Sequence, residues 1–390
     1  MSEVVKMKYE LMDMCSDDAI IKVIGVGGGG GNAVDHMVEG HIAGVQFICA
    51  NTDAQALRRL NVETKVQLGV ELTKGLGAGT RPEVGKQAAE ENREHLKEVI
   101  EGADMVFLTA GMGGGTGTGA ISVIAEVARE LGVLTVAVVT KPFDFEGKKK
   151  GMVAEAGIKE LEKQVDSLII IPNQKLLPVL GSNLSLLNAF KAANDVLLDA
   201  VQGITELITH PGLINVDFAD VKTVMSNMGT AIMGSGSATG DNRAREAAEK
   251  AIACPLLEDI DLQGANGILV NITASDMDLT EFDEIGSIMH AFASEDADMK
   301  IGTAINPEMG DEIKVTVVAT GMGVPAAVST PVKLVQKAAA GDVNYDVFDK
   351  PTVKRQAKQE VRETRFGAQP KNDVDLDYLD VPAFLRRQAD

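Results

Sequence analysis

The chain of 390 residues contains no tryptophan, and aromatic residues of all kinds make up only 4% of it. Since 45% of the residues are hydrophobic, the core must be built largely from small aliphatic side chains, which is typical of an α/β protein. Cysteine is also scarce: Cys15, Cys49 and Cys254 are odd in number and lie far apart. This pattern fits neither a disulfide framework nor a zinc site, and it predicts reduced thiols in a cytoplasmic protein.

Positive charge is in short supply, because 37 Lys and Arg face 57 Asp and Glu and leave a net charge of −20. Such a surface argues against a general binder of nucleic acid or anionic membranes. A bound nucleotide would have to be held by backbone amides and a cation such as Mg²⁺. The sequence has no run of about 18 apolar residues and no apolar leader, so we expect neither direct membrane insertion nor a signal peptide.

Glycine, in contrast, is abundant, and the stretch 111–119 (GMGGGTGTG) concentrates it between a strand-like run at 105–110 and a helical pattern at 120–131. Residues without Cβ allow left-handed dihedrals, so successive amides can point inward together at the N-terminus of the following helix. The hydroxyls of Thr116 and Thr118 can donate to phosphate oxygens. The loop has no lysine and is therefore not a Walker A loop. We interpret it as a phosphate cradle, because a simple turn needs fewer glycines.

A second glycine loop, 25–32, follows a buried strand at 20–24 and precedes helical spacing at 33–39 and a strand at 45–50. Its Gly25-x-Gly27-x-x-Gly30 spacing matches the dinucleotide fingerprint, which is weak on its own. A dinucleotide protein would also want an acidic residue closing the second strand, and Asp53 lies past that place. Two phosphate-type loops at strand ends favour a triphosphate held from both sides.

Strands and helices then alternate, which predicts an α/β fold with a doubly wound, mainly parallel sheet and a ligand site at the strand C-termini. The expected strands are 65–68, 133–140 and 167–171, and the expected helices are 83–101 and one ending near 163. A third glycine loop, 75–82, and Asn173 fall at the same edge.

A long helical pattern at 184–209 has the length of a helix that links two domains. A second, smaller α/β unit follows, with helices at 218–228, 242–254 and 280–293 and strands at 230–233, 267–273, 300–305 and 314–320. We therefore expect a flexible arm (1–18), a nucleotide-binding domain (19–183), a central helix (184–210), a C-terminal domain (211–323), a disordered linker (324–373) and a tail (374–390). The tail is either frayed or a short partner-binding helix.

The segment 215–220 (NVDFAD) is the acidic constellation that we single out. Asp217 can cap the next helix with Asp220 completing the cap. Alternatively, the carboxylates act on a nucleotide in a neighbouring subunit, because the loop lies about 35 Å from the glycine loops along the long helix. In the first half of that helix, Asp195 could accept from guanine with Phe190 against the ring, or it could pair with Lys191. The five histidines show no metal-ligand spacing and are interpreted as structural.

Taken together, the 111–119 loop, the glycine-rich start, the acidic loop and the tail segment 377–385 resemble the tubulin/FtsZ family of GTPases. The resemblance covers about 19–323 and the tail. It implies a GTPase of bacterial cell division that polymerises head to tail in a cytoplasmic ring at midcell and hydrolyses GTP to GDP and phosphate with Mg²⁺. It also implies that the tail binds membrane tethers of the FtsA and ZipA type, alongside other division regulators.

The resemblance further implies roles for individual residues. The residues implied to bind GTP or GDP are Gly28, Gly29, Gly30, Gly31, Asn32, Ala78, Gly79, Thr80, Gly113, Gly114, Gly115, Thr116, Gly117, Thr118, Glu146, Lys150, Asn173, Phe190 and Asp195. Lys150 stands where many relatives have arginine, so a point charge replaces a fork-shaped donor. Asn215, Asp217 and Asp220 would be catalytic in the next subunit's pocket. Two rival functions stay open: a Rossmann-type dehydrogenase, and a nucleotide-gated scaffold without catalysis.

Overall fold

The computed structural model describes residues 19–180, 185–209, 212–226, 229–257, 265–294 and 297–322. The expected N-terminal arm, linker and tail lie outside the described residues. None of the described helices is both long enough and apolar enough to cross a bilayer.

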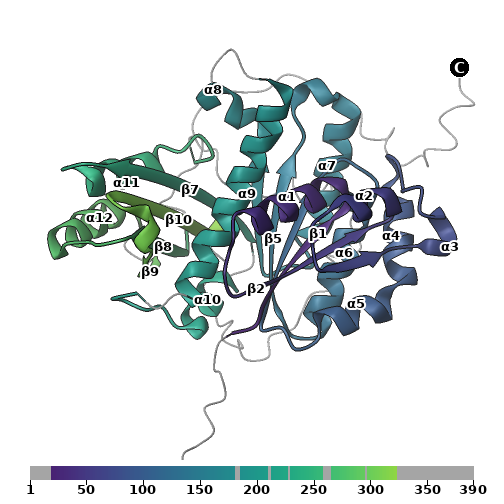
Figure 1. The fold of residues 1–390 in the computed structure, drawn as a ribbon, viewed down its shortest axis with the longest axis horizontal. Helices are drawn as coiled ribbons and strands as arrows, with labels where there is room; N and C mark the ends of the chain where they lie inside the picture. Colours follow the sequence, from purple (N-terminus) through teal and green to yellow (C-terminus); the bar gives the residue numbers. More distant parts are fainter. Residues whose placement is uncertain are drawn as a thin grey trace, which may run out of the picture. The chain divides into compact units, whose positions relative to one another are not determined.

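One ten-stranded sheet runs through this part of the chain, in the order β3-β2-β1-β4-β5-β6-β7-β10-β8-β9 (Figure 1). The strands from β3 to β7 are parallel, β10 is antiparallel to both of its neighbours, and β9 is parallel to β8. The strands are β1 (Ile21–Val26), β2 (Val45–Asn51), β3 (Thr64–Gln67), β4 (Met105–Gly111), β5 (Leu134–Lys141), β6 (Ser167–Pro172), β7 (Gly229–Thr239), β8 (Gly267–Ala274), β9 (Asp298–Ile305) and β10 (Glu312–Met322). This confirms the predicted α/β class with a doubly wound, mainly parallel sheet.

Helices cover both faces of the parallel part of the sheet. One face packs against α1, α9 and α10 and the other against α4, α5, α6 and α7, each through a core of small aliphatic side chains. The helices are α1 (Gly27–Glu39), α2 (Ala54–Arg59), α3 (Val70–Thr73), α4 (Pro82–Glu91), α5 (Arg93–Ile100), α6 (Thr116–Glu130), α7 (Lys148–Leu161), α8 (Leu177–Leu180), α9 (Leu186–Thr209), α10 (Phe218–Met225), α11 (Arg243–Ile252) and α12 (Leu279–Phe292).

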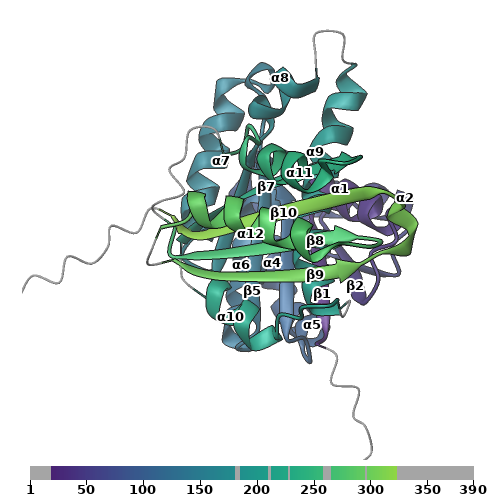
Figure 2. The same cartoon turned by 90° about the vertical axis from the view of Figure 1, so that its left-hand side faces the viewer.

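The 24-residue helix α9 lies between the parallel part of the sheet and the C-terminal domain, and α10 lies near its C-terminal end (Figure 1). In the C-terminal domain α11 and α12 pack on β7, β8 and β10 around a separate apolar core (Figure 2). The domain continues the sheet of the first domain, because β6 pairs with β7 from Ser167↔Gly229 to Ile169↔Ala231.

Three of the differences from the sequence-based expectation bear on how the elements pack. The helix expected at 83–101 is two helices, because Asn92 leaves the helical conformation and its side-chain oxygen accepts from the Gly69 amide at 2.7 Å. The strand expected at 230–233 extends to Thr239. Glycine usually weakens a strand, but here it admits close packing: an ideal Cβ at Gly236 would lie 2.4 Å from the Ala247 carbonyl oxygen of α11. The third difference, the start of α1, concerns the site below.

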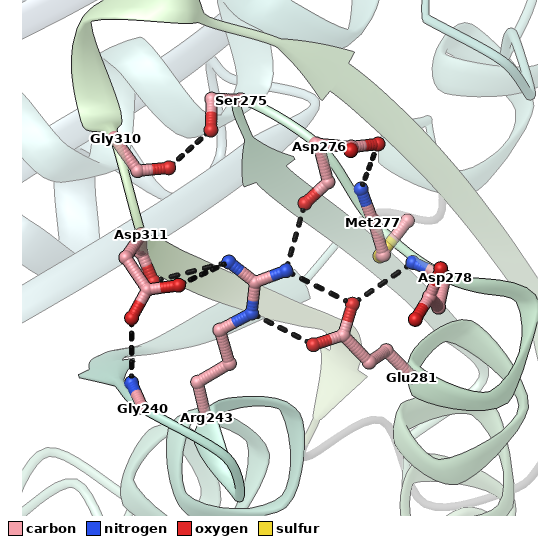
Figure 3. A network of polar contacts seen from close by, with 9 residues as sticks. All are labelled: Gly240, Arg243, Ser275, Asp276, Met277, Asp278, Glu281, Gly310 and Asp311. Atoms are coloured by element: carbon pink, nitrogen blue, oxygen red, sulfur yellow. Dashed lines mark hydrogen bonds and ion pairs between the residues drawn. The ribbon is translucent and has the colours of Figure 1, made fainter.

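Arg243, in the first turn of α11, ties together the loops at one end of the C-terminal domain (Figure 3). Its guanidinium donates to both Glu281 carboxylate oxygens, at 2.7 and 3.1 Å, and to the Asp311 carboxylate and the carbonyl oxygens of Asp311 and Asp276. The Arg243 side chain is only 14% exposed. The hydrogen bond from Arg243 holds the pKa of Glu281 below its usual range, so this stabilisation is present at neutral pH and is lost as acid protonates Glu281.

We therefore expect Arg243→Lys to destabilise the protein by about 2 kcal/mol, because an ammonium cannot reproduce the bidentate fork. The midpoint of urea unfolding measures this. Arg245→Lys on the same helix is the matched control, because the exposed Arg245 side chain pairs with Glu249 one turn away and should leave the midpoint unchanged. Equal midpoints for the two variants would contradict the structural role assigned to the fork.

Candidate nucleotide site

The strand order reverses between β1 and β4, which are neighbours in the sheet although β2 and β3 separate them in sequence. In a doubly wound sheet a ligand crevice forms at such a point, outside the strand C-termini. The two long glycine loops follow these two strands. The fold thus places the loops at 25–32 and 111–119 side by side without any contribution from their own side chains.

Most of the first glycine loop, from Gly27 onward, forms the first turns of α1. The sequence pattern had indicated a helix that begins only at Ala33. Glycine costs about 1 kcal/mol in a helix, but packing overrides this cost here. An ideal Cβ at Gly30 would lie 2.3 Å from the Thr109 carbonyl oxygen of β4, so only glycine fits. At Gly28, by contrast, a Cβ would have no described heavy atom within 4 Å. The open side of this turn faces a cavity.

The second glycine loop ends in α6, which begins at Thr116 and has no side-chain cap among the described residues. The Thr118 hydroxyl oxygen accepts from the Gly113 amide at 2.8 Å, and the Thr116 and Thr52 hydroxyls lie 2.6 Å apart. Both predicted phosphate donors therefore have a hydrogen bond inside the protein, and Thr118 does not line the cavity. The first-turn amides of α1 and α6 lack intrahelical acceptors, and both helix N-termini favour an anion.

Between these helix N-termini lies a cavity of about 310 Å³ that reaches from α1 and α6 to β6 and α9. It brings together most of the predicted nucleotide-binding residues, namely Gly28, Gly29, Asn32, Gly79, Gly114, Gly115, Thr116, Gly117, Glu146, Lys150, Asn173 and Phe190. The other predicted residues do not line the cavity; they are Gly30, Gly31, Ala78, Thr80, Gly113, Thr118 and Asp195. Of these, Ala78 is buried and Thr80 is exposed next to Gly79, whose carbonyl oxygen accepts from the Gly115 amide at 2.8 Å.

Glu146, which precedes α7, and Lys150, in its first turn, form an ion pair at the side of the cavity. Glu146 also accepts from the Phe143 amide at 2.9 Å, and Lys150 packs against Gly113, where an ideal Cβ would lie 2.6 Å from the lysine Cγ. Both side chains are therefore held in place before any ligand arrives. Phe190 is 40% exposed and meets the ring of Phe143 edge-on at 5.4 Å.

Asn173, which follows β6, is 4% exposed, and its side-chain carbonyl oxygen has no hydrogen-bond partner among the described residues. An unsatisfied buried acceptor costs about 1–3 kcal/mol, so a donor from a ligand would stabilise it. This orphaned acceptor lies on the β6 side of the cavity, away from the anion-favouring helix ends. The cavity therefore suits a ligand with an anionic end and a hydrogen-bond donor at the other.

Asp195 does not pair with Lys191. Its carboxylate oxygen lies 2.6 Å from His36 Nε2 of α1, and the neighbouring Asn194 lines the cavity instead. Sequence reasoning missed Asn194 and Leu197, although their spacing of four and seven residues from Phe190 placed them on its face of the helix. Gly111 and Met112, which also line the cavity, belong to the predicted cradle 111–119. Sequence reasoning missed Thr140, Pro142 and Ala193; Thr140 and Pro142 were recoverable, because they lie at the C-terminal end of β5, at the same sheet edge.

The acidic loop lies beyond the other end of α9, which spans about 36 Å at 1.5 Å per residue. Asp217 occupies the position before α10, but its side chain makes no capping hydrogen bond to the described residues. The Asp220 carboxylate pairs with Lys300 at 3.2 Å, and the Asn215 side-chain oxygen accepts from the Gly212 amide at 2.8 Å. The capping hydrogen bond expected of Asp217 is therefore absent among the described residues, and the Asp220 carboxylate, in the first turn of α10, pairs with Lys300.

No group of three or more His, Cys, Asp or Glu side chains in the described part of the chain is placed to bind a metal ion.

The chain matches family models and curated relatives. Residues 20–181 match the model of the tubulin/FtsZ family GTPase domain, and residues 229–323 match that of the FtsZ family C-terminal domain. Curated relatives named cell division protein FtsZ are similar over nearly the whole chain. That of Coxiella burnetii is 60% identical over 97% of this chain and 99% of the relative, and that of Pseudomonas aeruginosa is 58% identical over 98% and 100%.

Solved structures agree with this result. An empty FtsZ dimer from M. jannaschii matches with a TM-score of 0.76 and 42% identity over 79% of this chain and 90% of that one. CetZ2 from Haloferax volcanii, a GTPγS-bound protofilament, matches with a TM-score of 0.67 over 77% and 93%; at 20% identity it supports the fold alone. The resemblance inferred from the sequence is confirmed: the chain belongs to the tubulin/FtsZ family, within its FtsZ branch, and carries that family's GTPase domain.

Proposed function

We propose that this protein is a GTPase of bacterial cell division that polymerises head to tail and hydrolyses GTP where two subunits meet. One observation carries the proposal: the nucleotide cavity and the carboxylates of Asp217 and Asp220 lie at opposite ends of α9. Neither end contains a complete hydrolytic site. A contact between unlike ends joins them, and because such a contact is heterologous it extends into an open filament.

In this arrangement the triphosphate lies on the β1–β4 side of the cavity, against the N-termini of α1 and α6. The backbone amides there donate to phosphate oxygens and hold the charge in place. The base lies toward β6 and α9, where Asn173 accepts from guanine and Phe190 covers the ring. Glu146 and Lys150 hold the ribose, and Asp195, fixed by His36, accepts from the edge of the base. Mg²⁺ bound to the phosphates would neutralise their charge.

The catalytic groups come from the next subunit. Phosphoryl transfer needs positioning and charge stabilisation more than covalent chemistry. The carboxylates of Asp217 and Asp220 enter the neighbour's cavity and orient the attacking water, and Asn215 supports the loop that carries them. The comparisons do not favour the dehydrogenase or the non-catalytic scaffold, since the matched domain is a GTPase domain.

The proposed function also implies the partners of the protein. The chain assembles mainly with copies of itself, in a cytoplasmic ring at midcell. The tail 374–390, outside the described residues, binds tethers of the FtsA and ZipA type and other division regulators. Neither nucleic acid nor direct membrane insertion is involved.

The test is GTP turnover measured against protein concentration. We expect turnover per subunit to be negligible at low concentration and to rise above a threshold, because an isolated subunit lacks the carboxylates of its partner. Binding of GTP, measured by equilibrium dialysis, should show no such threshold. Turnover per subunit that is constant across a hundredfold dilution would show that one chain suffices and would overturn the proposal.

A further inference from the structure

Lys300, on β9, lies beside the acidic loop. Its ammonium is 3.2 Å from the Asp220 carboxylate and 3.6 Å from that of Asp298, which is two residues earlier in the strand and so on the same face. The hydrogen bond to Asp220 is the largest cause of a raised pKa for Lys300. Lys300 therefore stays charged at neutral pH.

The same strand also holds the backbone of the loop. Thr303 exchanges hydrogen bonds with Ile214: its amide donates to the Ile214 carbonyl at 3.0 Å, and its hydroxyl accepts from the Ile214 amide at 2.9 Å. Gly212 packs so closely that an ideal Cβ would lie 1.7 Å from the Thr303 carbonyl oxygen. Thus β9 fixes the loop backbone through Thr303 and one of its carboxylates through Lys300.

The positive charge of Lys300 also affects how the acidic loop can approach a bound nucleotide. Two carboxylates that approach a bound triphosphate repel it, and the repulsion grows as water is excluded from the contact. Asp217, Asp220 and Asp298 all add negative charge at this end of the subunit, and Lys300 is the cation that the structure pairs with two of them.

We infer that Lys300 is a positioning residue for hydrolysis at the subunit contact. Its ammonium holds the Asp220 carboxylate at the start of α10 in one orientation and offsets its charge as it meets the neighbour's nucleotide. The inference rests on the proposed function, because it takes Asp220 as the group that acts in trans.

The test is a cycle of four proteins: wild type, Lys300→Gln, Asp220→Ala and the double variant. Turnover is measured at saturating GTP and divided by the amount of protein that sediments as polymer, so a change in assembly alone does not count. We expect Lys300→Gln to lower turnover at least about fivefold, since a misplaced catalytic group is costly, while GTP affinity is unchanged. In the Asp220→Ala background the same substitution should have no effect.

Two further variants sharpen the test. Lys300→Arg keeps the charge and should recover most of the turnover. Lys222→Gln removes a lysine from the exposed side of α10 and is the matched control, which should behave as wild type.

Unchanged turnover per polymerised Lys300→Gln subunit would overturn the inference. So would an equal loss in the Asp220→Ala background, because Lys300 would then act through some other group. Failure of the proposed function gives a different result: Asp220→Ala would itself retain wild-type turnover.

Discussion

Thr116→Arg is expected to abolish GTP binding. Thr116 is 9% exposed at the N-terminus of α6 and lines the cavity, so a long side chain there must occupy the space of the phosphates. Loss of two charge-assisted hydrogen bonds to phosphate, at about 1.5–3 kcal/mol each, lowers affinity by more than about 100-fold. Equilibrium dialysis with labelled GTP measures the affinity. Thr280→Arg, the same change in the exposed first turn of α12, is the matched control.

A second variant separates loss of binding from loss of folding. At Gly28 an added methyl group meets no described atom within 4 Å and projects toward the cavity. Since alanine favours a helix over glycine, Gly28→Ala should not lower the unfolding midpoint, yet it should weaken GTP binding about tenfold or more. Wild-type affinity in both Thr116→Arg and Gly28→Ala would show that the phosphates do not lie at these helix ends.

Asp220→Ala is expected to bind GTP with wild-type affinity and to lose turnover by about 100-fold or more, the range for a positioned group that acts on the attacking water. Its own cavity is intact, because the substitution lies at the other end of α9. Asp298→Ala is the matched control: it removes the other carboxylate beside Lys300 and should keep most of the turnover.

Mixing the two inactive variants tests whether the site is shared. Thr116→Arg has an intact acidic loop and no nucleotide, and Asp220→Ala has a loaded cavity but lacks one of the two catalytic carboxylates. Together they form contacts in which both halves are intact, so the mixture should hydrolyse GTP although neither variant does so alone. A chain that carries both substitutions should not restore turnover to Asp220→Ala. A mixture that remains inactive while the two variants demonstrably associate would place the carboxylate's role within its own chain.

Local pattern was enough to predict the parallel sheet, the glycine loops, the long helix and the family. It failed where the conformation or the partner of a residue depends on a segment that is distant in the sequence. The start of α1 inside a run of glycines depends on close packing against Thr109 of β4, which overrides the low helix propensity of glycine. Asp195 pairs with His36, which is 159 positions away in the sequence. Asp220 of α10 pairs with Lys300 of β9, which is also distant in the sequence. The sequence places such side chains on an element but does not determine their partners.

Glycine backbone packed against neighbouring backbone forms much of the cavity wall, and this limits how resistance to a competing drug could arise. A side chain at Gly115 or Gly117, which line the cavity, would collide with a carbonyl oxygen, at 2.6 Å and 2.8 Å from an ideal Cβ, so these positions cannot mutate without disturbing the fold. Gly28 and Gly114 have room for a methyl group, but filling that room takes space from the phosphates. A competitor that touches only these atoms meets a surface that the bacterium cannot alter and still bind its own nucleotide. Escape would have to come from more distant side chains such as Phe190.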